Sequence, residues 1–139
     1  MDLRTSGPPD HGNSARPMRI PTMLNDTHAL RLGRLMDVAT LKAQVIAGNL
    51  ANQNTPGYRS RAVDFEAAFQ DAINQGGDPL EVEAKIYEPR DTAVDVDGND
   101  VSVEGEVLAG AQNAFMYQTY VSILQGRNRL YNTALTSAP

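Results

Sequence analysis

Apolar residues recur at steps of three and four in the first half of the chain, which places them on one face of an α-helix. The pattern runs from about residue 26 to 52, and Asp26 or Thr27 can cap its first turn. A second stripe beside the first widens the apolar face. The first stripe consists of Leu32, Leu35, Ala39, Ala43, Ile46 and Leu50, and the second of Val38, Leu41 and Val45.

The same spacing returns in the last third of the chain. It continues unbroken for more than four heptads and predicts a helix over about 104–135 with a coiled-coil seam. The seam positions are Val103, Val107, Gly110, Ala114, Tyr117, Val121, Leu124, Asn128, Tyr131 and Leu135. We expect this seam, through Val103, Val107, Val121, Leu124 and Leu135, to pack on Leu35, Ala39, Ile46 and Leu50 of the first helix.

Shorter patterns fill the region between these helices. Residues 63–74 predict a short helix capped by Asp64, and residues 80–87 alternate between apolar and polar in the manner of a strand. An Asp97-Gly98 turn between two short β-prone stretches, 93–96 and 101–103, predicts a small hairpin. The apolar face of the short helix would hold Phe65, Phe69 and Ile73.

The end of the first helix is marked by polar and turn-forming residues. Asn52 and Asn54 suit a left-handed C-terminal cap. In the following stretch, 55–58, Pro56 and Gly57 occupy the second and third positions, which predicts a type II turn. This turn would set the direction in which the chain leaves the helix.

These patterns predict a mainly α fold, in which long N- and C-terminal helices pair as a coiled-coil-like bundle around a short loop- and β-rich acidic middle segment. We divide the chain into a disordered extension (1–23), the N-terminal helix and its turn (24–58), a short helix with a loop or hairpin (59–103) and the C-terminal helix (104–136). Two helices cannot enclose a core alone. The apolar surface left over favours coverage by partner chains, and coverage by the middle segment is the alternative. This surface includes Leu108, Phe115, Ile123 and Leu130.

Charge and composition exclude several classes of function. The net charge of −5 divides into +2 over residues 1–58, −9 over 59–106 and +2 over 107–139, which argues against a nucleic-acid partner. The absence of Cys and the presence of only two His exclude disulfide scaffolds, Cys-ligated metals and most catalytic triads. No apolar run approaches the roughly 20 residues of a membrane span, and we expect no cleaved secretory signal.

Candidate chemistry is sparse. The chain lacks phosphate-binding loops and nucleophile elbows, and Glu81 and Glu83 alternate on a predicted exposed strand face. We therefore expect no enzyme activity, no cofactor and no metal. One calcium hypothesis exists, because Asp95, Asp97, Asn99 and Glu106 are spaced as in an EF-hand loop, but Asp100 stands where that loop requires Gly.

Residues 46–58 resemble the signature of bacterial flagellar rod, hook and hook-associated proteins. The residues that carry the match are Asn49, Ala51, Asn52, Thr55, Pro56, Gly57 and Tyr58. The continuation over 59–65 and the stretch 97–101, with the short length of the chain, resemble the proximal-rod members of this family in particular.

The resemblance implies a structural subunit of the periplasmic rod in the flagellar basal body. It implies export in an unfolded state by the flagellar type III apparatus, and helical stacking through the terminal helices. The implied partners are other copies of the chain, FlgC-like and FliE-like rod proteins and the MS ring. The alternatives are another short rod protein, a coiled-coil adaptor or secretion-chaperone-like binding module, and a calcium-binding protein.

Overall fold

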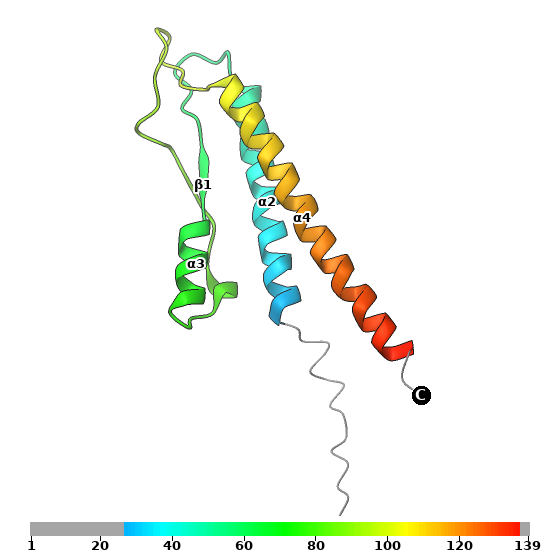
Figure 1. Cartoon of the computed structure of the whole chain (residues 1–139). Helices are drawn as coiled ribbons and strands as arrows, with labels where there is room; N and C mark the ends of the chain where they lie inside the picture. The colour runs from blue at the N-terminus through cyan, green and yellow to red at the C-terminus, as the bar shows by residue number, and fades with distance from the viewer. Residues whose placement is uncertain (1–26, 137–139) are drawn as a thin grey trace, which may run out of the picture.

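The fold consists of two long paired helices with a small mixed segment between them in sequence. A computed structural model describes residues 27–136, so the predicted extension over 1–23 lies outside the described residues. The long helices are α2, Thr27–Ala51, and α4, Val103–Thr136 (Figure 1). Between them lie β1 (Ala62–Asp64), α3 (Glu66–Asn74), the 3₁₀ turn η1 (Pro79–Glu81) and β2 (Lys85–Tyr87). The mainly helical fold class is confirmed.

α2 and α4 pack side by side in opposite directions. The Nδ2 of Asn113 donates a hydrogen bond to the Ala39 carbonyl at 2.7 Å. One turn nearer the start of α4, Gly110 brings its backbone close to Ile46, and a Cβ at this glycine would lie 3.8 Å from Ile46 Cγ2. A shallow cleft along this contact is lined by Ala39, Ile46 and Leu50 from α2 and by Gly110, Ala114 and Tyr117 from α4.

Only part of the predicted seam of α4 meets α2: Gly110, Ala114 and Tyr117 line the contact, and other seam positions do not. Val103, Val107 and Leu135 are exposed, so the expectation that they pack on α2 is wrong within this chain. A strict 3.5-residue repeat drifts by about 20° per heptad around a straight helix, so not every seam position faces α2. Leu135 is exposed for a second reason: α4 has 34 residues and α2 has 25, so α4 extends past the start of α2 (Figure 1).

The middle segment covers the opposite side of α2, as Figure 1 shows. Its core consists of Val38 from α2 together with Phe65 and Phe69, whose ring centroids lie 5.1 Å apart. Arg34 extends across this core, donating to the Val82 carbonyl at 2.8 Å with its guanidinium 5.7 Å from the Phe65 ring centre. Lys42 forms an ion pair with Glu66. The middle segment therefore covers part of the wide apolar face of α2, while the outer side of α4 stays uncovered.

The short elements have different bounds from those that the sequence predicts. The reasons are the pairing of β1 with β2 and a side-chain hydrogen bond from the backbone to Asp78. β1 takes residues 62–64, where Asp64 pairs in register with Lys85, so α3 begins later and Asp64 does not cap it. The expected strand over 80–87 is shortened to β2, because Asp78 accepts from the Leu80 amide and turns η1.

The predicted hairpin over 93–103 forms its turn but not its strands. Gly98 adopts a φ of +85° and donates its N–H to the Asp95 carbonyl at 2.9 Å. The residues after the turn instead make side-chain hydrogen bonds to the end of α2, and α4 begins directly at Val103.

Replacing Gly126 by Ala is expected to raise the free energy of unfolding by about 1 kcal/mol, because glycine is a poor helix former. A Cβ at this position would meet nothing within 4 Å, so no clash offsets the gain. Gly98→Ala is the matched contrast: its φ of +85° disfavours L side chains, and its Cβ would lie 3.3 Å from Gly57 Cα. Urea unfolding followed by circular dichroism should show a higher free energy of unfolding for Gly126→Ala and a lower one for Gly98→Ala. Equal changes in the two variants would contradict these different roles of the two glycines.

Candidate assembly site at the helix junction

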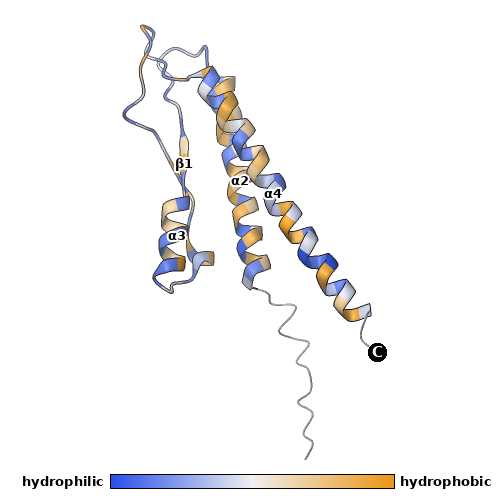
Figure 2. Ribbon diagram, viewed as in Figure 1, coloured by the Kyte–Doolittle hydropathy of each residue, from blue (hydrophilic) through white to orange (hydrophobic). Residues whose placement is uncertain are grey.

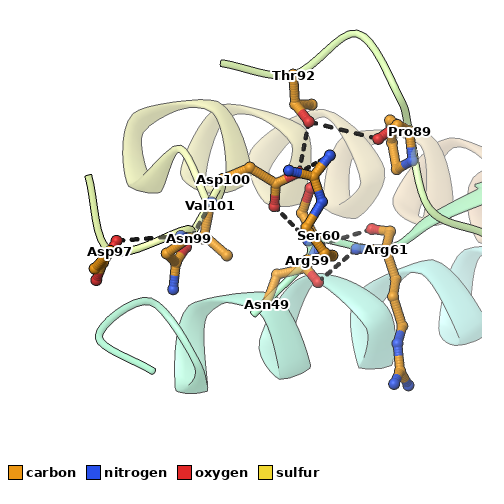
Figure 3. A network of polar contacts seen from close by, with 10 residues as sticks. All are labelled: Asn49, Arg59, Ser60, Arg61, Pro89, Thr92, Asp97, Asn99, Asp100 and Val101. Carbon is orange, nitrogen blue, oxygen red and sulfur yellow. Dashed lines mark hydrogen bonds and ion pairs between the residues drawn. The ribbon is translucent and has the colours of Figure 1, made fainter. Parts of the chain in front are cut away.

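The end of α2 and the start of α4 are joined by a network of polar contacts (Figure 3). Two stretches about forty residues apart in sequence meet there. We call this network the junction; its residues are Asn49, Asn52, Thr55, Gly57–Arg61, Thr92, Asp97–Val101 and Glu106.

Asn49 is the centre of the junction and is only 1% exposed. Its Nδ2 donates to the Arg61 carbonyl and to Glu106 Oε1, both at 2.8 Å. Its Oδ1 accepts from the Arg61 N–H at 2.9 Å and from the Tyr58 hydroxyl at 3.2 Å. The side chain thus uses both amide hydrogens and its oxygen at once, which an aspartate or an apolar residue cannot do.

Asn99, in the stretch 97–101, binds the backbone that follows α2. Its Nδ2 donates to the carbonyls of Asn52 at 3.0 Å and Thr55 at 2.8 Å, in the turns that directly follow α2. The Gly57 N–H in turn donates to the Asp97 carbonyl at 2.9 Å. The stretch 97–101 therefore acts as an external cap for α2.

The turn after α2 has the geometry that its sequence predicts. The Tyr58 N–H donates to the Thr55 carbonyl at 3.2 Å, and Gly57 has a φ of +72°, as the third position of a type II turn requires. The expected left-handed cap at Asn52 or Asn54 is wrong, because only glycines have positive φ among the described residues. Asn52 instead turns its Nδ2 back to the Gly48 carbonyl at 2.9 Å.

Asp100 is a buried carboxylate that ties three segments together. Oδ1 accepts from the Ser60 N–H at 2.5 Å, and Oδ2 accepts from the Thr92 hydroxyl at 2.5 Å and lies 3.3 Å from an Arg59 guanidinium nitrogen. Burial acts to raise the pKa of Asp100, but the hydrogen bonds from Thr92 and Ser60 and the charge of Arg59 outweigh it. The pKa therefore lies below its usual value.

The stability that Asp100 contributes is expected to depend on pH. Its pKa is lower in the folded chain than in the unfolded chain, so the contribution is present above the unfolded value of about 3.9 and is lost as the pH falls through the folded value. Asp100→Asn should lower the free energy of unfolding by about 1–3 kcal/mol at pH 7. Urea unfolding at pH 7 and pH 3 should show this difference shrinking in acid. Exposed Asp91→Asn is the control, and a difference that is constant across this range would reject the assignment.

The residues of the hypothetical calcium loop form hydrogen bonds with other groups of the protein. Asp97 Oδ1 accepts from the Asn99 N–H at 3.1 Å, the Asn99 amide donates to carbonyls, and Glu106 accepts from Asn49. Within residues 27–136 no group of three or more His, Cys, Asp or Glu side chains is arranged to hold a metal ion. None of the described helices is both long and apolar enough to cross a membrane.

A cleft of about 400 Å³ opens between α2, α4 and β1. Its lining includes Val38, Ile46, Val63 and Met116, with Tyr120 at one side. Burial, and then the nearby carboxylate of Glu66, raise the pKa of Tyr120 above its usual value. The cleft lies beside the helix pair.

The junction brings together five of the seven signature residues and several that the sequence did not single out. Asn49, Asn52, Thr55, Gly57 and Tyr58 all take part. Ala51 and Pro56 are exposed and lie outside the hydrogen-bond network. The sequence singled out Glu106 only as a position of the calcium-loop hypothesis, and it singled out Asn99 and Asp100 through that hypothesis and through the family-like stretch 97–101. Ser60 lies in the family-like continuation over 59–65, whereas no sequence pattern pointed to Thr92.

The antiparallel terminal helices are joined through the stretch 46–58, whose residues resemble the signature of flagellar axial proteins. No family model matches the chain. The chain is 30% identical to the flagellar basal body rod protein FlgB of Bacillus subtilis over 113 residues, covering 70% of this chain and 84% of that protein. It is 27% identical to FlgB of Yersinia ruckeri and 26% identical to FlgB of Escherichia coli, each alignment covering 66% of this chain and about four-fifths of the relative. The chain belongs to the FlgB family of flagellar basal body rod proteins.

Proposed function

We propose that this chain is a structural, non-catalytic subunit of the proximal rod, and that it assembles helically in the periplasm through α2 and α4. The observation that carries the proposal is an apolar stripe on α4 that no other part of the described chain covers. The stripe consists of Leu108, Phe115, Ile123 and Leu130, which are 60%, 69%, 46% and 72% exposed. We call it the α4 stripe.

The α4 stripe has the properties of an interface between subunits. Its members are spaced by seven, eight and seven residues, which places them along one side of the helix. Hydrophobic residues recur along the whole of α4, beyond the part that pairs with α2 (Figure 2). Burying each such side chain is worth about 1.5–3 kcal/mol, and contiguous exposed apolar surface marks interaction sites. We infer that neighbouring subunits cover it.

We propose that the neighbours are other copies of this chain, FlgC-like and FliE-like rod proteins and the MS ring. The relatives' names as basal body rod proteins support neighbours within the basal body. Export in an unfolded state by the flagellar type III apparatus fits a chain whose described apolar core is small. In the described part, the buried hydrophobic core consists only of Val38, Ala39, Phe65 and Phe69. The absence of Cys suits passage through a narrow channel.

A photo-crosslinking residue at position 115 tests the proposal directly, because Phe115 lies in the centre of the α4 stripe. In cells with assembled flagella, we expect it to capture copies of this chain or neighbouring rod proteins, identified by mass spectrometry. The same photo-crosslinking residue placed at exposed position 125 is the control, because it reports random encounters outside the α4 stripe. Capture of soluble cytoplasmic proteins only would instead support the adaptor or chaperone-like alternative.

Replacing Leu124 by Asp is expected to block assembly and motility. Leu124 is half-buried at a predicted seam position in the second half of α4, so a charge there is expected to weaken the helix pair itself. Swimming in soft agar and thermal unfolding by circular dichroism should both be impaired. Gln125→Asp, on an exposed position of the same helix, should leave both unchanged, and unimpaired swimming of Leu124→Asp would reject a packed seam.

A further inference from the structure

The contact between α2 and α4 leaves an apolar groove open along the two helices. The groove has a volume of about 460 Å³, and its lining includes Ile46 and Leu50 of α2 and Tyr117 of α4. The small residues of the lining leave it open, because they fill little of the space beside the helix contact. These residues are Ala39, Ala43, Ala47, Gly110 and Ala114. We call this opening the α2–α4 groove.

The α2–α4 groove carries no charge. Its polar lining residues, Thr40, Asn113 and Gln118, are all uncharged. The cleft of about 400 Å³ beside β1 differs in this respect, because its lining includes both lysine and arginine and two glutamates. The buried centres of protein interfaces are depleted of charged residues. The α2–α4 groove therefore favours an apolar, uncharged partner surface.

The α4 stripe is such a surface. α4 has no charged residue from 107 to 126, and this stretch contains Leu108, Phe115 and Ile123. Phe115 lies at its centre and is 69% exposed. Exposed apolar residues elsewhere are less suitable, as Val96 shows, which has an aspartate on either side. Large side chains on the stripe thus match small side chains in the groove.

The α4 stripe cannot fill the groove of its own chain. Asn113 marks the side of α4 that faces α2, since its side chain donates to the Ala39 carbonyl. At 3.6 residues per turn, Phe115 lies about 160° around the helix from Asn113. Phe115 therefore points away from α2, and the occupant of the groove must be another molecule.

The lengths of the two surfaces agree. Consecutive members of the α4 stripe are about 10–12 Å apart along the helix axis, and the groove extends about 16 Å along α2 from Ala39 to Leu50. It therefore holds Phe115 together with one adjacent member of the stripe. Packing the stripe into the groove covers both exposed apolar surfaces at once, whereas a contact between two stripes leaves both grooves uncovered.

We propose that the α4 stripe of one copy packs into the α2–α4 groove of a neighbouring copy, with Phe115 against Ala43 and Ala47. The stripe and the groove are different surfaces, so each copy makes the contact twice, once with each surface. Such a heterologous contact continues from copy to copy, as a helical assembly requires. The inference deepens the proposed function and rests on it, because copies of this chain must meet in the rod.

The residue that a photo-crosslinker at position 115 captures tests this contact. A benzophenone amino acid keeps a large aromatic side chain in place of Phe115. In cells with assembled flagella, we expect a covalent dimer of this chain whose new bond lies within residues 39–50 of the second copy, as located by mass spectrometry of its peptides. A bond to a second α4 stripe or to residues 1–26, or capture of other rod proteins only, overturns the proposal and leaves the rod assignment intact. Capture of no basal body protein rejects both.

Filling the groove tests the same contact from the other side. Ala43→Phe is expected to lower the yield of this dimer several-fold, because the larger side chain occupies the space that Phe115 of the neighbour needs. Gln44→Phe is the matched control, since it adds the same side chain at an exposed position of α2 outside the groove lining. Thermal unfolding of the purified chains should be the same for both variants, because Ala43 is exposed too. Equal dimer yields from the two variants overturn the proposal.

Discussion

Replacing Asn49 by Asp is expected to open the junction and lower the free energy of unfolding by about 3–5 kcal/mol. The carboxylate lacks the two amide hydrogens that reach the Arg61 carbonyl and Glu106, so both acceptors lose their donor. It also places a second negative charge beside Glu106 at a site that is 1% exposed. For a domain whose total stability is typically 5–15 kcal/mol, this loss is large. Thermal unfolding of the full chain followed by circular dichroism measures it.

Two further variants separate the hydrogen bonds from the charge. Asn49→Ala removes the amide without adding a charge and should cost about 1–3 kcal/mol, less than Asn49→Asp. Asn54→Asp makes the same chemical change at an exposed position of the same signature stretch and should stay within about 0.5 kcal/mol of the unchanged chain. If Asn49→Asp and Asn54→Asp unfold at the same temperature, Asn49 is not the centre of the junction.

Replacing Phe115 by Asp is expected to abolish motility while leaving the fold intact. Phe115 is 69% exposed in the single chain, so the change should alter the stability of the free chain by no more than about 0.5 kcal/mol. In an assembled rod, the same side chain would be buried against a neighbour. The substitution then removes about 1.5–3 kcal/mol of apolar burial per contact and adds an unpaired buried charge. The loss repeats at every copy in a helical assembly.

The readout combines swimming in soft agar with thermal unfolding of the purified chain. Gln125→Asp is the matched control, because it introduces the same charge on the same helix at an exposed polar position outside the α4 stripe. Normal swimming of the Phe115→Asp strain would show that the α4 stripe is not an interface. A large fall in stability of the free chain would show that Phe115 serves the fold instead.

The long helices and the turn after α2 were predictable because their signals are local or strongly repeated. The three-and-four spacing extends over both helices, so it specifies them even where single residues deviate. Pro56 and Gly57 likewise impose a type II turn on four neighbouring residues. The sequence was less able to predict which seam residues of α4 face α2. A repeat of 3.5 residues and one of 3.6 differ by only about 20° per heptad, so the pattern does not show that Val107 faces away.

The junction and the short strands were not predictable in the same way. β1 has three residues and depends on β2, twenty residues further along the chain, so no local pattern reveals it. Asn99 acts on Asn52 and Thr55 across more than forty residues. Asp100 depends on Thr92 and Ser60, whose small hydroxyl side chains are common in any loop. The signature residues indicated where the junction lies, but its partners emerge only from the folded chain.

Mass spectrometry of purified basal bodies tests the central claim, that this chain is a rod subunit joined to its neighbours through α4. We expect the unchanged chain to be enriched together with the rod proteins and the MS ring, and the Phe115→Asp chain to be missing from the same preparation although the cells still contain it. Absence of the unchanged chain from basal bodies of motile cells, or full recovery of Phe115→Asp, would contradict the account.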